Sequence, residues 1–416
     1  MNDPTPTPGP TAPPASCDVL VIGAGPAGSA CALALARAGR DVLLADQHDF
    51  PRDKVCGDGL IPDSHAALRR LGVLDEVAAL ATHLPHVRCV GPRGGFVDVP
   101  GTLSVLPRKV LDHVLVRAAQ RAGARLLTPL RFEAPLLDGE RVVGARLRAP
   151  DGSREIAARW VVLATGAAPT ALIAAGVCER RTPSGIALRG YVRHDAMTGR
   201  IAQLQIVWHP RLRGGYGWIF PAPGGVFNIG CGLTGSHLVQ RDGRGRMQDV
   251  NLRRMLDDFC AVYAPARELM AGGEPLGDVK GAPLRCSLRG ARWSRPGLLV
   301  TGEAAGSTYA FSGEGIGKAM ETGLLAAGAL LAESRAAGDD DAVRQRYETA
   351  LRTLQPRFDL YETASHVNHR PWIADLVVWR ARRSPRILQR MSGMLEETQN
   401  PGRLFSWRGM TKLMLE

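Results

Sequence analysis

The sequence predicts an α/β fold in which a parallel, nucleotide-binding sheet is joined to a second, antiparallel sheet and to a helical C-terminal region. Three observations lead to this prediction. A glycine-rich turn follows a short apolar run near the N-terminus, the middle of the chain alternates short β-type runs with turns, and residues after 335 have helical character. The 416 residues are enough for two or three domains with cores of their own.

Residues 17–46 contain each part of a strand–helix–strand unit. The apolar run DVLVI is typical of a buried parallel strand, and Gly23, Gly25 and Gly28 follow it as G-x-G-x-x-G. The Ala/Leu-rich helix SACALALARAG then leads to a second strand that ends at Asp46, where an acidic residue can hold a ribose hydroxyl. We therefore predict a Rossmann-like unit that places a pyrophosphate on the helix N-terminus.

Three later segments complete the pattern. They are VLPRKVLDHVLVRAAQRAGARLL (105–127), RWVVLATGAAP (159–169) and GLLVTGEAAGSTYAFSGEGIGKAMETGLLAAGALLA (297–332). With the glycine motif, these segments resemble the FAD-dependent oxidoreductases built like aromatic hydroxylases. The resemblance implies FAD as the cofactor. The sequence contains no second Rossmann unit, so NAD(P)H docks transiently as the external reductant or an electron-donor protein replaces it.

Two further motifs are more specific. PRDKVCG (51–57) matches P-x-x-K-x-C-G, and YGWIFP (216–221) with GGVFNIGCG (224–232) matches Y-x-W-x-F-P and its trailing G-x-G. On these motifs the chain is identified as a member of the geranylgeranyl reductase family, over nearly all its length. The resemblance implies reduction of C=C bonds in an isoprenoid or other apolar substrate, by hydride from reduced flavin. A monooxygenase acting on an aromatic or polyketide-like molecule is the alternative. A halogenase ranks lower, because only Trp218 and Pro221 of W-x-W-x-I-P are present.

The resemblance also implies contacts with FAD. They are Arg108 on the cofactor, Thr165 and Gly166 at its adenine side, Gly302 and Glu303 at the ribityl chain, and Gly313, Gly315 and Ile316 at the start of a helix whose positive end faces the flavin. Arg52 and Lys54 lie in the loop after the second strand, where either side chain can meet a phosphate.

Cys56 is the candidate catalytic residue. An ordinary thiol has a pKa of about 8.5, so Cys56 is protonated at neutral pH and can donate a proton. Two other interpretations stay open: a lining residue without a chemical role, and a small buried hydrophobe.

Tyr216, Trp218 and Phe220 alternate as on a strand and therefore share one face. This face is predicted to bind an apolar substrate above the flavin. The competing interpretation is a sheet face packed on its own core.

Composition excludes several classes of protein. The net charge of +12 allows an anionic partner, but 5% aromatic residues and the absence of any known nucleic-acid motif argue against nucleic acid. Eight scattered cysteines without a C-x-x-C pair indicate neither a metal site nor disulfides, and fit a cytoplasmic protein. The first sixteen residues have neither the basic start nor the apolar core of a signal peptide.

The C-terminal region contains an aromatic and basic helix. Trp372, Leu376 and Trp379 recur at helical spacing within RPWIADLVVWRARRSPRILQRMSGML. Beside them lie Arg380, Arg382, Arg383, Arg386 and Arg390. This pattern fits a peripheral contact with a membrane on its cytoplasmic side. An ordinary helix whose tryptophans cover the core is the competing interpretation.

We expect the following domains. Residues 1–16 form a disordered Pro-rich tail; 17–80, 106–178 and 284–335 form a discontinuous FAD-binding domain; 81–105 and 179–283 form the substrate domain; and 336–416 are helical, with breaks near Pro356, Pro371, Pro385 and Pro401.

Overall fold

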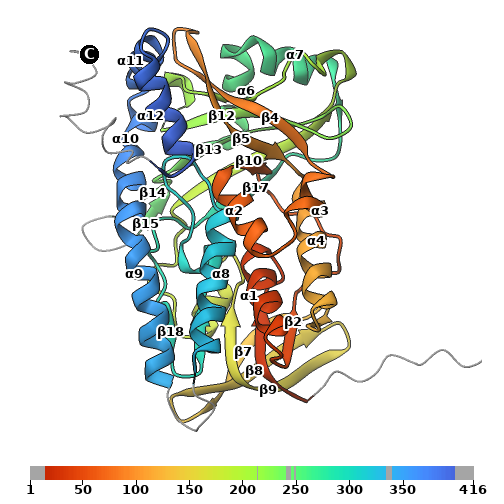
Figure 1. Ribbon diagram of the computed structural model, residues 1–416. Coiled ribbons are helices and arrows are strands. Elements are labelled where there is room, and N and C mark those ends of the chain that lie inside the picture. Colours follow the sequence, from red (N-terminus) through yellow and green to blue (C-terminus); the bar gives the residue numbers. More distant parts are fainter. Residues whose placement is uncertain (1–14, 213, 240–244, 248–249, 334–339, 399–416) are drawn as a thin grey trace, which may run out of the picture.

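The computed structural model describes residues 15–398, apart from 213, 240–244, 248–249 and 334–339. Two sheets lie at opposite ends of the molecule, and helices run along one side from the first sheet to the second (Figure 1). The predicted α/β class, with a Rossmann-like sheet, a second sheet and C-terminal helices, is confirmed. Of the predicted Pro-rich tail, only Ala15 and Ser16 are among the described residues, and Ser16 already begins a strand.

The first sheet has eight strands, and its central five are parallel in the order β19-β9-β1-β2-β6. Its strands are β1 (Ser16–Ile22), β2 (Val42–Ala45), β6 (Arg125–Leu127), β7 (Arg131–Asp138), β8 (Arg141–Ala149), β9 (Gly152–Leu163), β18 (Ser294–Arg295) and β19 (Leu298–Val300). Strands β7, β8 and β9 form an antiparallel extension. The apolar runs of β1 and β2 are buried because helices and this extension cover them.

Helices α1 (Pro26–Arg37), α4 (Arg108–Arg121) and α8 (Ile316–Leu331) lie side by side against the parallel sheet (Figure 1). Helices α1 and α8 can approach closely because Gly323 of α8 has no side chain: a Cβ atom there would lie 2.2 Å from the carbonyl oxygen of Ala27. The turn at Gly302–Ala305 also packs against α1, since a Cβ atom at Gly302 would lie 2.5 Å from the Ala27 Cβ. Three shorter helices are α2 (Pro62–Arg70), α3 (Leu74–Ala78) and α5 (Thr170–Ala174).

The second sheet has nine strands in the order β16-β10-β13-β12-β11-β4-β5-β3, with β17 also paired to β10. They are β3 (Gly59–Leu60), β4 (Thr82–Val90), β5 (Phe96–Val105), β10 (Gly185–Arg193), β11 (Leu204–Val207), β12 (Gly215–Ala222), β13 (Val226–Thr234), β16 (Glu274–Pro275) and β17 (Lys280–Leu284). One pair, β4 with β11, is parallel, where the sequence predicted an antiparallel sheet. The long connection between them through the first sheet permits it, since parallel strands need a crossover.

Helices α6 (Leu252–Val262) and α7 (Ala264–Gly272) cover the far side of this sheet, and a small hairpin joins β14 (His237–Val239) to β15 (Gly245–Met247). Asn251 caps α6, its side chain accepting hydrogen bonds from the backbone N–H groups of Arg253 and Arg254.

The C-terminal region consists of α9 (Asp340–Ala364), α10 (His366–His369), α11 (Trp372–Ala381) and α12 (Pro385–Leu395). The predicted break at Pro356 is wrong, because α9 continues through it. A proline inside a helix costs one hydrogen bond, but buried residues such as Leu351 and Phe358 anchor α9 on both sides. Pro371 and Pro385 lie at helix starts, and Pro401 lies outside the described residues. Within the described part of the chain, no helix is both long enough and apolar enough to cross a membrane.

Candidate active site

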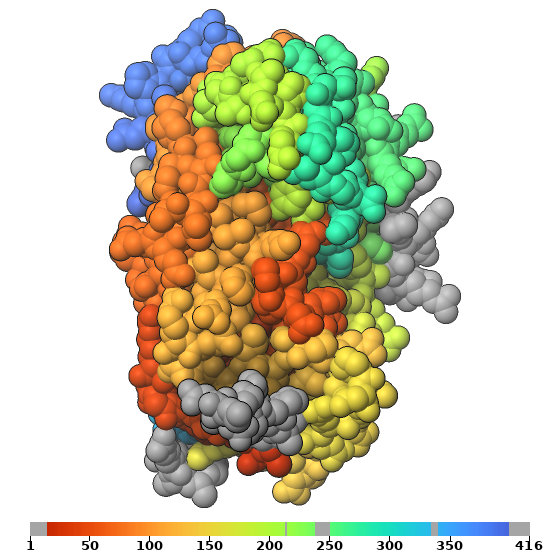
Figure 2. All heavy atoms as spheres, turned by 90° about the vertical axis from the view of Figure 1, so that its right-hand side faces the viewer, coloured from red at the N-terminus to blue at the C-terminus, as the bar shows by residue number. Residues whose placement is uncertain are grey.

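A cavity of about 500 Å³ lies between the two sheets. Sixteen of the predicted site residues line it: Gly23, Gly25, Asp46, Arg52, Lys54, Cys56, Arg108, Thr165, Gly166, Tyr216, Trp218, Phe220, Glu303, Gly313, Gly315 and Ile316. Its wall therefore joins segments from the whole chain. The segment that follows β2, drawn in red-orange, reaches the surface on the face shown in Figure 2.

Two predicted residues, Gly28 and Gly302, do not line the cavity. A Cβ atom at Gly28 would lie 1.8 Å from the carbonyl oxygen of Gly23, so Gly28 lets α1 pack against the end of β1. Gly302 has the corresponding position against Ala27. These glycines support the turn and the helices, and their contact with a cofactor stays a prediction.

The turn after β1 forms a polar end to the cavity. Gly23 has a φ angle of +102°, which favours glycine. The Asp46 carboxylate accepts a hydrogen bond of 2.8 Å from Ala24 N and one of 3.0 Å from His48 N, and it thereby fixes the turn. Among the described residues, no side chain caps the N-terminus of α1 at Gly25, so its N–H groups can take an anion.

Two guanidinium groups lie beside this helix start. A Cβ atom at Gly25 would be 3.7 Å from Nη2 of Arg52 and 3.8 Å from Nη2 of Arg108. Asp112, which the sequence analysis missed, holds both arginines. It accepts hydrogen bonds of 2.6 and 2.9 Å from Arg108 and one of 3.1 Å from Arg52. The sequence offers one indication of this role: Asp112 follows Arg108 by four residues on a predicted helix, a spacing at which the two side chains can pair.

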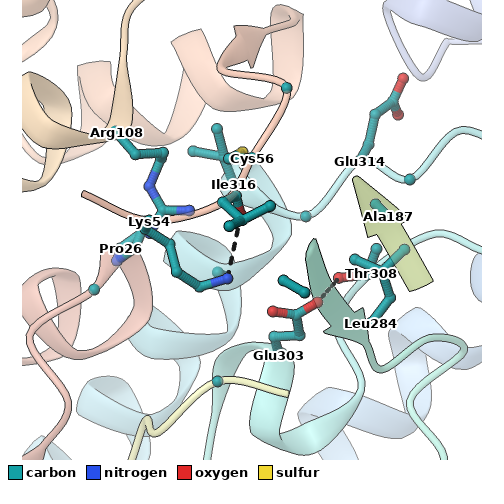
Figure 3. Close-up of a pocket in the computed structure, with 18 of the residues that line it drawn as sticks. Pro26, Lys54, Cys56, Arg108, Ala187, Leu284, Glu303, Thr308, Glu314 and Ile316 are labelled. Atoms are coloured by element: carbon teal, nitrogen blue, oxygen red, sulfur yellow. Dashed lines mark hydrogen bonds between the residues drawn. The ribbon is translucent and has the colours of Figure 1, made fainter. Parts of the chain in front are cut away.

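This polar end fits a dinucleotide such as FAD. A bare helix N-terminus, a glycine without a side chain and two anchored guanidinium groups together suit a pyrophosphate. The hydroxyl of Thr165 is buried at the cavity without a hydrogen-bond partner among the described residues, and is free for a ligand. Lys54 and Glu303 point into the cavity from opposite sides in Figure 3. Lys54 donates to Val55 O (3.3 Å), and Glu303 accepts from Thr308 Oγ1 (3.3 Å).

Cys56 lies on the same cavity wall as Arg108 and Ile316 (Figure 3). Burial raises the pKa of the Cys56 thiol above its ordinary value, although the charge of Arg108 lowers it in part. The Sγ atom accepts a hydrogen bond of 3.4 Å from Asp58 N. The thiol therefore stays protonated at neutral pH but is a weak acid. Its catalytic role stays a prediction.

A buried hydrogen-bond network that the sequence did not predict fixes the Cys56 loop. Asp58 is fully buried, accepts hydrogen bonds from the hydroxyl of Tyr191 and from Asn228 Nδ2 (2.7 Å), and has a pKa raised to about 6 by burial. Asn228 also donates to Cys56 O (2.7 Å) and accepts from Trp218 Nε1 (2.9 Å). The two family motifs are thus physically linked. Asp58 has a positive φ of 66°. This backbone conformation is known only from the fold, and no pattern in the sequence marks the residue.

The aromatic residues of β12 line the cavity as one row. The ring centroids of Tyr216 and Trp218 are 6.2 Å apart, and those of Trp218 and Phe220 are 6.3 Å apart. A Cβ atom at Gly57 would lie 3.2 Å from the Phe220 ring, so this glycine lets the Cys56 loop pack on the row. The Tyr216 hydroxyl donates to the carbonyl oxygen of Ser312, which ties the row to the loop before α8.

A second, smaller cavity of about 110 Å³ adjoins the first under α11 and α12. The two share Val87, Ile206, Tyr216, Ser312, Glu314 and Leu395. The wall of the smaller one is otherwise almost entirely apolar, with Trp208 and Phe311 stacked at 6.3 Å. The two cavities are therefore neighbours, and the smaller one is suited to an apolar group.

Comparison with known proteins also indicates an FAD-binding protein related to reductases. Residues 16–197 match the FAD binding domain family. The chain is 33% identical to menaquinone reductase of Mycolicibacterium smegmatis over 74% of its length and 75% of that protein. It is 30% identical to digeranylgeranylglycerophospholipid reductase 1 of Methanopyrus kandleri, over 74% and 79%.

Solved structures share the fold over nearly the whole chain. A geranylgeranyl bacteriochlorophyll reductase-like protein from Thermoplasma acidophilum has a TM-score of 0.69 at 21% identity, covering 96% of both chains. The flavin-dependent brominase Bmp2 has a TM-score of 0.74 at 19% identity, covering 96% of this chain and 98% of its own. At these identities the likeness concerns the fold alone, and the fold is common to reductases and halogenases.

Proposed function

The chain belongs to the geranylgeranyl reductase family of FAD-dependent oxidoreductases, and from this premise we propose that it reduces C=C bonds of an isoprenoid or similarly apolar substrate. The observation that carries the proposal is a pair of adjoining cavities, the larger one polar at the dinucleotide turn and the smaller one apolar under α11 and α12. Two relatives, 33% and 30% identical to this chain, are named menaquinone reductase and digeranylgeranylglycerophospholipid reductase. Both named substrates contain isoprenoid chains.

FAD fits the polar end of the cavity. In this proposal the start of α1, Arg52 and Arg108 hold its pyrophosphate, Asp46 its ribose, and Thr165 and Gly166 its adenine side. Glu303 contacts the ribityl chain, while Gly313, Gly315 and Ile316 lie beside the flavin ring. When bound, FAD supplies a hydride after an external reductant, NAD(P)H or an electron-donor protein, has reduced it.

The protein's own residues then bind and orient the substrate. Tyr216, Trp218 and Phe220 give an apolar wall that excludes water around the reacting bond. Cys56 lines the same space, and the network through Asn228 keeps its loop in place. The second cavity takes the remaining length of an apolar chain.

We further propose that the protein contacts the cytoplasmic face of an anionic membrane through α11. Trp372 and Trp379 are 53% and 48% exposed, so the interpretation that they cover the core is wrong. Arg383 lies 4.8 Å from the Trp379 ring, and Arg382 lies 6.0 Å from the ring of Phe96, itself 42% exposed. Aromatic rings beside cations suit a lipid headgroup region, where each basic residue contributes about 1 kcal/mol.

Flotation with anionic liposomes tests this contact. We expect binding at low salt that decreases as salt screens the charges, and that is lost in Arg382→Glu/Arg383→Glu. The matched control is Arg253→Glu/Arg254→Glu on α6, which makes the same charge change on another exposed surface. Absence of binding at low salt, or equal loss in both variants, contradicts the proposal.

The reaction itself is tested with enzyme reduced in advance and mixed with polyprenyl, quinone and aromatic substrates, with and without oxygen. We expect products heavier by two hydrogens, formed without oxygen. A product heavier by one oxygen and formed only in air would instead identify a monooxygenase.

A further inference from the structure

One half-buried carboxyl group at the junction of the two cavities has no role in the function proposed above. Glu314 lies in the loop that leads into α8, and it lines both cavities. We propose that Glu314 donates the proton that completes the reduction of the substrate, and this inference rests on the proposed function. Glu314 lies between Gly313 and Gly315 of the glycine-rich loop, but no site role is expected for it from the sequence motifs.

The loop holds Glu314 in a defined position. Its backbone oxygen accepts a hydrogen bond of 2.9 Å from Tyr309 N, and Gly313 N donates to Tyr309 O at 3.0 Å. The bond from Tyr216 to Ser312 O fixes the loop from the other side. In Figure 3 the Glu314 side chain points away from Lys54, Cys56 and Glu303. The side chain of Glu314 therefore also lines the second, apolar cavity, although its neighbours Gly313 and Gly315 are expected beside the cofactor.

The surroundings keep this acid protonated at neutral pH. Burial, together with the negative charges of Asp63 and Glu397, raises the pKa of Glu314 to about 8, although Ser312 and Lys318 lower it in part. The charged and titratable groups that interact with Glu314 are Asp63 on α2, Lys318 on α8, Tyr216 on β12, Tyr361 on α9 and Glu397 after α12. An acid with a pKa near the working pH is an effective proton donor.

A cluster of charged groups centred on Lys318 lies close enough to Glu314 to affect its charge. Lys318 Nζ lies 2.8 Å from Glu321 and 2.8 Å from Glu397, and 3.7 Å from Asp63. The Glu321 side chain is 26% exposed, whereas that of Asp63 is nearly buried. Asp63 Oδ2 has no hydrogen-bond partner among the described residues, and burial raises the pKa of this carboxyl to about 6. These groups can return a proton from water to Glu314.

The reduction adds a hydride to one carbon of the C=C bond and a proton to the other. One carbon receives the hydride from the reduced cofactor, and the π electron pair forms the second C–H bond with the proton of Glu314. The O–H bond of Glu314 breaks, its electron pair stays on the carboxylate, and the proton is then restored from water by way of the charged cluster around Lys318. Glu314 is better suited than Cys56, because burial raises the pKa of the Cys56 thiol above its ordinary value of about 8.5.

The test uses the full-length protein loaded with FAD and three variants. Glu314→Gln keeps the size and a hydrogen-bond donor but cannot release a proton, Glu314→Asp keeps the acid, and Cys56→Ser removes the competing thiol. Infrared spectra across the titration should show a protonated carboxyl band in the wild type that disappears as the pH passes about 8 and is absent in Glu314→Gln. FAD content should be the same in all four proteins.

Turnover of substrate by pre-reduced enzyme without oxygen gives the second measurement. We expect the rate to fall about 100-fold in Glu314→Gln, in the range of general acid catalysis, with partial recovery in Glu314→Asp. The wild-type rate should decrease above pH 8 or so, as Glu314 ionises, and Cys56→Ser should retain this decrease.

The two proposals fail in different ways. A wild type that reduces none of the substrates contradicts the proposed function, and this inference with it. Reduction by the wild type together with an unchanged rate and pH profile in Glu314→Gln contradicts the Glu314 inference alone. An infrared band showing Glu314 ionised at neutral pH does the same.

Discussion

Replacing Asp112 by asparagine should destabilise the protein and weaken its binding of FAD. Asp112 is fully buried and accepts three hydrogen bonds from the guanidinium groups of Arg108 and Arg52. Asparagine has the same shape but no charge, and its NH₂ group would face a cation. Removing one partner of a buried ion pair leaves the other charge uncompensated, which costs about 3–5 kcal/mol.

A second pair in the same protein gives a matched control. Asp98 also binds an arginine through two hydrogen bonds, both of 2.7 Å to Arg88, but these side chains are 30% and 23% exposed. Water solvates the arginine that Asp98→Asn leaves behind, so we expect a loss of about 1 kcal/mol or less. The two variants thus make the same chemical change at different burial.

Urea unfolding of the cofactor-free proteins, followed by circular dichroism, measures the free energy of unfolding. Leaving FAD out separates stability from cofactor binding, because a ligand stabilises whatever fold it binds. Fluorescence titration then gives FAD affinity, which should weaken only in Asp112→Asn. Equal losses of stability in the two variants would refute the argument that burial makes the Asp112 network costly to break.

Three further outcomes are expected. Denaturation should release yellow FAD into the filtrate, since no flavin-linking motif was found, and colour retained on the precipitated chain would contradict a non-covalent cofactor. Gly28→Ala should abolish FAD loading, because its Cβ would lie 1.8 Å from Gly23 O. The control Gly328→Ala has open space around the new Cβ in α8 and should be neutral or stabilise the protein by about 1 kcal/mol. Normal FAD loading of Gly28→Ala would show that the turn can shift. Cys56→Ser should keep FAD and lose less than about 10-fold in turnover if Glu314 is the acid, and a 100-fold loss would return the role to the thiol.

The sequence by itself determined the features that are local along the chain. The first strand, the glycine turn, the helix and Asp46 lie within thirty residues or so, and each is specified by its own spacing. Alternation on one strand likewise placed Tyr216, Trp218 and Phe220 on one face, and the structure brings all three to the cavity. The helical spacing of Trp372 and Trp379 was visible too, but not whether they face inward or outward.

The tertiary structure decided how distant segments meet. Asp58 and Asn228 are 170 positions apart, and no periodicity relates them, yet their hydrogen bond joins the cysteine loop to the aromatic strand. The protonation of Glu314 is likewise invisible in the sequence, where it is one glutamate in a glycine-rich loop. Its pKa depends on burial and on carboxylates from α2 and from beyond α12. Local pattern follows from backbone geometry, whereas desolvation and charge interactions depend on neighbours in space, and only the folded chain supplies those neighbours.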